Sequence, residues 1–233
     1  MTLRVYPATT AWQQARLLLL HGAGAAVDSA FFQQLIPCLT ASGIEVHAAN
    51  FAYMAKTLTG QRQVAPKAEK LLPELTEMID KLSGDVTATS DHMPLWLGGK
   101  SLGGRVISLY LAGPAVAAQV VGGVVFGYPL CPPAKAKDVA KAAQTIAARS
   151  HFLQQLQRPL LICQGSRDAF GNAAALQNAG VGKAAAGFVP ATVLELVLAD
   201  HDFSLPKKRQ TDIAADAAFT QAARAVADFI CRF

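Results

Sequence analysis

The chain has 233 residues, of which 52% are hydrophobic and only 16% are charged. This composition excludes an intrinsically disordered chain, because such chains combine low hydrophobicity with high charge. The formal net charge is +5, and the basic residues are scattered apart from a run at 207–209. Nucleic-acid binding is not expected, since it requires a basic stripe or patch. Single α/β domains commonly exceed about 200 residues, so we expect one domain over residues 1–233.

Short apolar runs alternate with longer stretches of helical periodicity along the chain. In chain order we expect a strand at 16–20, a helix at 29–42, a strand at 44–48, a helix at 64–82, a strand at 94–98, a helix at 102–112, strands at 120–126, 159–163 and 192–198, and a final helix at 212–233. This alternation predicts an α/β fold with a mostly parallel central sheet and helices on both faces. Ligands bind such sheets beyond the carboxyl ends of the strands.

Two apolar segments could be mistaken for membrane signals. The first, at 17–20, is shorter than the roughly 7–15 apolar residues of a signal peptide. The second, at 106–134, carries no charge, but glycines and prolines divide it, and a buried helix followed by a buried strand explains it better. We therefore expect no membrane span.

The four cysteines have no CxxC spacing and no cluster of cysteine and histidine ligands accompanies them. Such a pattern is typical of free thiols in a reducing compartment rather than of disulfides or a zinc site. We expect a cytoplasmic protein that binds no metal.

The strongest motif is Gly-Lys-Ser-Leu-Gly at 99–103, which fits the pattern G-x-S-x-G. It stands between a predicted strand and a predicted helix, where Ser101 would sit on a tight, strained turn. The residues two before and two after the serine must be small, or their side chains would collide across the turn. An ordinary glycine-rich loop is the simpler alternative. A phosphate-binding loop is a weaker one, because Pro94 stands where its first glycine is needed.

A serine hydroxyl is a poor nucleophile until a base takes its proton, and the base is usually a histidine that a carboxylate orients. Of the five histidines, His201 alone follows a late strand directly, whereas His21 looks structural. Asp168 follows the strand at 159–163 and is the candidate for the orienting acid. Asp200 and Asp202 flank the histidine and compete with Asp168 for the role of the orienting acid. Turn formation is the alternative for all three aspartates.

Hydrolysis of an acyl group passes through an oxyanion, which two backbone N–H groups can stabilise. One donor is expected from Leu102, directly after the nucleophile. The other is expected from the loop at 21–25, where small residues let the backbone approach a substrate. Ala23 is our first choice for that donor and Gly24 the second, and a flexible loop is the alternative.

Aromatic and apolar residues follow two of the predicted strands and are candidates for a substrate pocket. Tyr53 and Met54 follow the strand at 44–48, and Tyr128 follows the strand at 120–126. Packing beneath loops explains them equally well. Lys100 is a candidate for attracting an acidic substrate, although a solvated basic loop is the simpler interpretation.

Six motifs carry a resemblance to a known family. They are HGAGA at 21–25, NFAYM at 50–54, GGKSLGGR at 98–105, GYPLCPP at 127–133, QGSRDAFG at 164–171 and DHDF at 200–203. From about residue 16 to its end the chain resembles the small, cap-less α/β-hydrolases related to dienelactone hydrolases. More narrowly, it is similar to the group that includes the testis-expressed hydrolase-like proteins.

This resemblance implies a single α/β-hydrolase domain with little or no cap. It also implies the nucleophile, acid and base of that fold at Ser101, Asp168 and His201, in the chain order of the family. Dienelactone hydrolases proper have a cysteine nucleophile where this chain has Ser101. The narrower group often has a proline where this chain has Ala52, and some of its eukaryotic members act as scaffolds.

The leading hypothesis is a cytoplasmic serine hydrolase, similar to carboxylesterases, that acts on small acyl esters or thioesters. It needs no cofactor and no metal, and its expected partner is the small-molecule substrate, with neither nucleic acid nor membrane involved. Homo-oligomerisation is left open. The alternative is a catalytically silent binding or scaffold protein of the same fold. An oligopeptidase would share the triad but would usually carry an extra domain, which we do not expect here.

Overall fold

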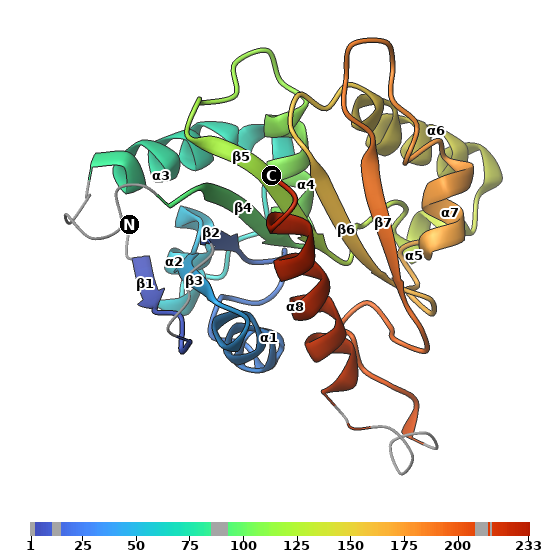
Figure 1. Cartoon of the computed structure of the whole chain (residues 1–233). Helices are drawn as coiled ribbons and strands as arrows, with labels where there is room; N and C mark the ends of the chain where they lie inside the picture. Colours follow the sequence, from blue (N-terminus) through green and yellow to red (C-terminus); the bar gives the residue numbers. More distant parts are fainter. Residues whose placement is uncertain (1–2, 11–14, 85–92, 208–213, 215) are drawn as a thin grey trace.

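The computed structural model describes residues 3–10, 15–84, 93–207, 214 and 216–233. A seven-stranded sheet with the order β1-β3-β2-β4-β5-β6-β7 forms its centre (Figure 1). β1 pairs with β3 in antiparallel fashion and all other neighbouring pairs are parallel, which confirms the mostly parallel sheet. The strands are β1 (Leu3–Tyr6), β2 (Ala15–Leu20), β3 (Ile44–Ala49), β4 (Leu95–Lys100), β5 (Val120–Phe126), β6 (Leu160–Gly165) and β7 (Ala191–Leu196).

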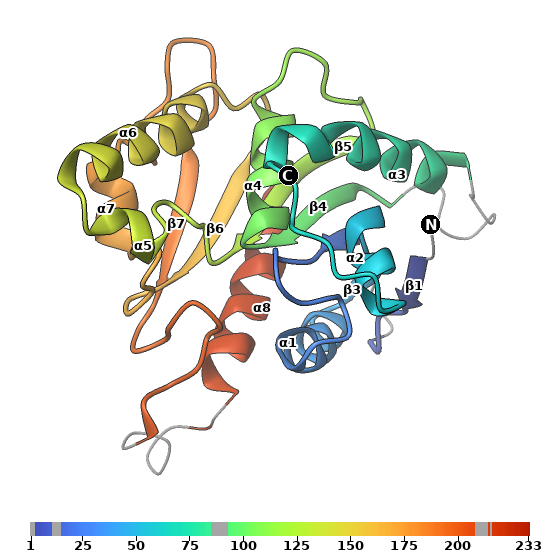
Figure 2. The same ribbon diagram turned by 180° about the vertical axis from the view of Figure 1, so that it is seen from behind.

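Helices cover both faces of the sheet. They are α1 (Ala30–Ala41), α2 (Ala52–Leu58), α3 (Leu72–Gly84), α4 (Leu102–Leu111), α5 (Pro133–Ala136), α6 (Val139–Ser150), α7 (Ala173–Asn178) and α8 (Ala217–Ile230), with 3-10 turns η1 (Ala68–Leu71) and η2 (His151–Gln154). α1 and α8 lie together on one face, seen in front in Figure 1. α3 and α4 cover the other face, seen in front in Figure 2.

The buried side chains form two apolar layers, one on each side of the sheet. Along β2, Leu17 and Leu19 pack in the layer beneath α1 and α8, whereas Leu18 and Leu20 pack in the layer beneath α3 and α4. Successive side chains of a strand point to opposite faces, so a strand that is apolar at every position is covered on both sides. This continuous burial holds the carboxyl ends of the central strands in fixed positions.

The helix expected at 64–82 begins later than predicted. Residues 64–67 are not helical, η1 follows them, and α3 begins only at Leu72. Pro66 explains the delay, because a proline disfavours helical backbone at the residue before it. Val64, the first residue of the expected helix, is 93% exposed.

β1 was not predicted, because it is a four-residue edge strand that pairs only with β3 and carries two exposed residues. The final helix begins at Ala217, while residues 212, 213 and 215 lie outside the described residues. So do residues 208 and 209 of the basic run.

The uncharged segment at 106–134 folds as the larger part of α4, a turn, β5 and the loop after it. This is the helix and strand that its glycines and prolines predicted. Within the described ranges, no helix combines the length and the apolar character that crossing a bilayer requires.

Candidate active site

Ser101 stands on the turn that joins β4 to α4, at the carboxyl end of a central strand. Its backbone angles are φ 51° and ψ −108°, a region that side-chain-bearing residues rarely adopt. A Cβ added to Gly99 would lie 2.3 Å from the carbonyl carbon of Gly103, and one added to Gly103 would lie 2.7 Å from the His21 oxygen. Glycine is therefore required on both sides of the serine, as the G-x-S-x-G pattern predicted.

The structure brings Ser101, His201 and Asp168 into one chain of hydrogen bonds. The Ser101 Oγ atom lies 3.1 Å from His201 Nε2, and His201 Nδ1 lies 2.7 Å from Asp168 Oδ2. A carboxylate only accepts hydrogen bonds, so Nδ1 carries the proton and Nε2 is left to accept the serine hydroxyl hydrogen. In this arrangement His201 can take a proton from Ser101.

Asp168 is held by two further donors. Gln164 Nε2 donates to Oδ2 at 2.8 Å, and the Phe170 N–H donates to Oδ1 at 2.7 Å. The carboxylate is buried, and these bonds fix its second oxygen as well as its orientation toward His201. Gln164 is the last residue but one of β6. The sequence reasoning missed it, although it stands in the motif that contains Asp168.

The two aspartates beside the histidine serve other contacts. Asp200 Oδ1 accepts the N–H groups of Asp202 and Ser204, both at 2.9 Å, which is the turn role expected as the alternative. The Asp202 carboxylate lies 3.2 Å from Lys100 Nζ and is 70% exposed.

Lys100 corrects both interpretations drawn from the sequence, since it is neither solvated nor aimed at the pocket. It is only 5% exposed, and its Nζ donates to the His201 carbonyl oxygen at 2.6 Å. Burial lowers the pKa of this ammonium, while Asp202 counteracts that effect. The side chain lies over the Phe31 ring, 5.0 Å from its centroid. Lys100 thus ties the end of β4 to the loop that carries His201.

The loop at 21–25 lies beside the nucleophile. The Gly103 N–H donates to the His21 carbonyl oxygen at 3.1 Å, which fastens this loop to α4. Ala23 and Leu102 line the same pocket as Ser101. Within the part of the chain that the structure describes, neither Ala23 N–H nor Leu102 N–H donates to a protein acceptor. Both amides are therefore available to an oxygen of a bound molecule.

His21 is buried and supports this loop. Its Nε2 accepts the Phe51 N–H at 3.0 Å, so the proton stands on Nδ1, which donates to the Gly22 oxygen at 2.6 Å. Burial lowers the pKa of His21 to about 4, despite the opposing effect of the Gly22 carbonyl. The neutral ring is thus part of the structure, in keeping with the structural role expected for it.

The three residues predicted to line a substrate pocket do not line the one that contains Ser101. Tyr53 is buried, and its hydroxyl donates to the carbonyl oxygens of Gly22 and Ala23, at 3.1 and 3.3 Å. Met54 is part of the apolar layer beneath α3 and α4. Tyr128 is fully buried and its hydroxyl donates to the Arg149 carbonyl oxygen. All three follow strand ends as predicted, but their side chains turn into the protein, where packing and hydrogen bonds hold them.

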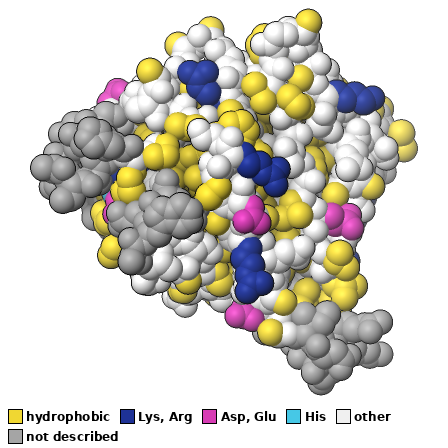
Figure 3. All heavy atoms as spheres, viewed as in Figure 1, with side chains coloured by type: hydrophobic (Ala, Val, Ile, Leu, Met, Phe, Trp, Pro, Cys, Tyr) yellow, Lys and Arg dark blue, Asp and Glu magenta, His cyan; other side chains and the backbone are white. Residues whose placement is uncertain are grey.

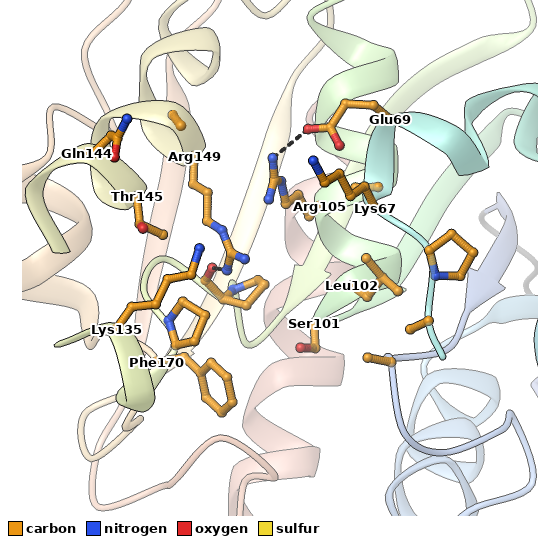
Figure 4. A pocket seen from close by; sticks show the side chains of 17 residues that line it. Lys67, Glu69, Ser101, Leu102, Arg105, Lys135, Gln144, Thr145, Arg149 and Phe170 are labelled. Carbon is orange, nitrogen blue, oxygen red and sulfur yellow. Dashed lines mark hydrogen bonds and ion pairs between the residues drawn. The ribbon is translucent and has the colours of Figure 1, made fainter. Parts of the chain in front are cut away.

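The pocket that contains Ser101 has a volume of about 630 Å³. Of the three triad candidates only Ser101 lines the pocket, and we call it, together with the His201 and Asp168 side chains hydrogen-bonded in series behind it, the floor. The first wall is residues 65–69 with Arg105 of α4, and the second wall is the lining residues between 129 and 149, including those of α5 and α6 (Figure 4). Phe170 also lines the pocket, and its ring packs on the His201 imidazole with centroids 4.4 Å apart. The sequence pointed to Pro129, which follows the strand at 120–126, as a possible wall residue, but not to Phe170 or to the other wall residues.

The described residues hold no group of three or more histidine, cysteine and carboxylate side chains that could bind a metal. All four cysteines are free. Burial raises the pKa of the Cys163 thiol to about 12, so this thiol stays protonated.

Comparison with solved structures identifies the fold. A dienelactone hydrolase from Anabaena variabilis matches with a TM-score of 0.68 and 15% identity, over 98% of this chain and 90% of that one. Est1E from Butyrivibrio proteoclasticus with bound ferulic acid matches with a TM-score of 0.66 and 11% identity, over 99% and 94%. A monoacylglycerol lipase from Paleococcus ferrophilus matches with a TM-score of 0.62 and 14% identity, over 100% and 99%.

At these identities the solved structures show a common fold rather than a common activity. No curated protein matches the chain in sequence. The family model described as an alpha/beta hydrolase domain matches residues 13–231, almost the whole chain. The chain therefore belongs to the alpha/beta hydrolase domain family, as the resemblance of its motifs implied.

Proposed function

We propose that the protein is a serine hydrolase that acts on small acyl esters or thioesters. The observation that carries this proposal is the hydrogen-bond chain from Ser101 Oγ through His201 to Asp168, with heavy-atom distances of 3.1 and 2.7 Å. Both distances are within the reach that proton transfer between a nucleophile and its base requires. The dienelactone hydrolase and the monoacylglycerol lipase among the solved structures of this fold agree with an ester substrate.

In the proposed reaction, Ser101 Oγ attacks the carbonyl carbon while His201 Nε2 takes the hydroxyl proton. Asp168 stabilises the resulting imidazolium, which then gives the proton to the departing alcohol or thiol. Water attacks the acyl-serine by the same route and releases the acid. The N–H groups of Ala23 and Leu102 stabilise the oxyanion of each tetrahedral intermediate, an effect of about 3 kcal/mol per donor. No step needs a cofactor or a metal.

The free thiols support a reducing, cytoplasmic location, because an oxidising compartment favours disulfides. A small-molecule substrate is the proposed partner, because the pocket volume is within the range of roughly 300–1,000 Å³ that small-molecule sites occupy.

A fluorophosphonate probe tests the nucleophile. Intact mass after incubation should show a single stoichiometric adduct on the wild-type protein and none on Ser101→Ala. Ser204→Ala is the matched control, since this serine is exposed and does not line the pocket, and it should label as the wild type does. Absence of an adduct on folded protein would overturn the proposal and favour the binding or scaffold alternative.

A further inference from the structure

The pocket walls carry an excess of positive charge. Four basic side chains line the pocket, Lys67 and Arg105 from the first wall and Lys135 and Arg149 from the second. Glu69 is the single acidic residue among the lining residues. Figure 4 shows all four basic side chains extending into the space between the walls, on the side of the pocket away from the Ser101 floor.

The two arginines are only partly neutralised by the protein. Arg105 Nη2 pairs with Glu69 Oε1 at 2.6 Å, while its Nε is buried and has no partner among the described residues. Arg149 Nη1 donates to the uncharged Pro129 carbonyl oxygen at 2.5 Å. A guanidinium has five N–H donors, but each of these two guanidinium groups donates to only one acceptor among the described residues. Arg105 Nη1 and the remaining Arg149 nitrogens have no acceptor among the described residues and are left for a bound molecule.

The two guanidinium groups also repel each other. Burial lowers the pKa of Arg149, and the nearby charge of Arg105 lowers it further. Two like charges in a half-buried pocket destabilise each other unless a negative charge lies between them. On the face shown in Figure 3, the lysines and arginines that are coloured stand apart from one another.

Arg105 follows Ser101 by four residues, one turn along α4. The Arg105 N–H donates to the Ser101 carbonyl oxygen at 2.9 Å, so the two backbones are one turn apart. From this turn the Arg105 side chain extends away from Ser101 toward Glu69 (Figure 4). An acyl chain that ends in an anion would bridge the space between the carbonyl that Ser101 would attack and this guanidinium.

We propose that the substrate is an ester or thioester that carries its own anionic group, a carboxylate or a phosphate, bound between Arg105 and Arg149. A planar guanidinium matches both anions with two parallel hydrogen bonds, and Lys67 and Lys135 add charge at the exposed rim. This inference rests on the proposed hydrolase function and names the substrate class of the same site.

The test compares matched esters. Monoethyl glutarate is compared with its neutral monoamide, and a phosphorylated hydroxy-acid ethyl ester with its unphosphorylated form. The wild-type protein should favour at least one anionic ester by about tenfold or more in kcat/KM, since hydrogen bonds to charged groups are strong. The pair that shows the larger preference identifies the anion. Equal rates within both pairs would overturn the inference.

Three pocket variants and one control variant test whether the wall charges cause this preference. Arg149→Gln should abolish most of it, and Lys135→Gln should reduce it a few-fold. Lys137→Gln is the matched control, because Lys137 is exposed, lies two residues from Lys135 and does not line the pocket. Glu69→Gln changes an exposed side chain and should increase the preference, so the inference stays testable if the arginine variant does not fold. A preference that none of the pocket variants alters would contradict the role of the walls.

The fluorophosphonate adduct separates failure of this inference from failure of the proposed function. No adduct and no turnover of any ester would overturn both. Labelling without turnover leaves protection as the readout: glutarate or inorganic phosphate should slow labelling more than glutaramide, the neutral diamide of glutarate, does. Equal protection by the anions and the amide would overturn the anionic substrate alone.

Discussion

The floor of the pocket and its walls are held in different ways. Asp168 and the backbone around Ser101 are buried and accept or donate several hydrogen bonds, and Lys100 fastens the His201 loop from below. Lys67, Glu69 and Lys135 in the walls are exposed and have few contacts. The comparison teaches that the reactive groups depend on packing across the whole sheet, whereas the wall charges can change at little cost to the fold. Substitutions in the floor should therefore affect activity and stability far more than substitutions in the walls.

The largest effect is expected from Asp168, and Asp202, which also lies near His201, is its control. Asp168→Asn replaces an acceptor with an amide that can donate to Nδ1, which moves the imidazole proton to Nε2 and removes the acceptor for Ser101. Turnover should fall by about 10³- to 10⁴-fold. Asp202→Asn keeps an acceptor for Lys100 at an exposed position and should lower turnover less than about tenfold. Steady-state kinetics of both variants checks this, and equal losses would mean that the acid is misassigned.

The next effect is a loss of stability that should differ between two glycines near the nucleophile, Gly99 and Gly24. A methyl group at Gly99 collides with the backbone of Gly103 and Gly104, both 2.3 Å away. Gly99→Ala should therefore destabilise the protein by about 3 kcal/mol or more. Gly24→Ala is the matched control, because a Cβ there meets nothing within 4 Å. Urea denaturation of both variants measures the difference, and a Gly99→Ala protein as stable as the control would contradict the packing of the floor.

The third expected effect is the acid sensitivity that the buried, neutral His21 gives to the folded protein. Unfolded His21 takes up a proton below pH of about 6.5, whereas the folded residue, with its pKa lowered to about 4 by burial, does not. The unfolded state thus binds more protons, and stability falls as the pH drops from about 6.5 to about 4, by about 3 kcal/mol in total. Above that range this residue contributes no pH dependence.

Free energies of unfolding between pH 4 and 7 check this expectation (the range is set by the two pKa values, about 4 and about 6.5). His21→Gln keeps an acceptor for the Phe51 N–H but does not titrate, so its stability should vary less with pH across the same range. A variant that loses stability as steeply as the wild type would show that other groups cause the acid sensitivity.

The sequence by itself determined the parts of this protein that local chemistry dictates. The glycines at 99 and 103 are needed by the backbone of the turn at Ser101, and a repeating alternation of apolar strands and helices is needed to cover a parallel sheet. Both requirements act over a few residues, so the turn and the sheet can be predicted from the spacing of glycines and apolar residues in the sequence. Ser101, Asp168 and His201 likewise could be read from the sequence, because each comes shortly after the end of a strand, in chain order.

Only the tertiary structure decided which way the remaining side chains point. Lys100 and Tyr128 follow strand ends as surface residues do, but both turn inward, because His201 and Arg149 offer buried carbonyl oxygens to them. The pocket walls combine residues 65–69, Arg105 and residues 129–149, segments that are distant in the sequence. No local pattern sets their spacing, since it depends on how helices on one face of the sheet pack against each other.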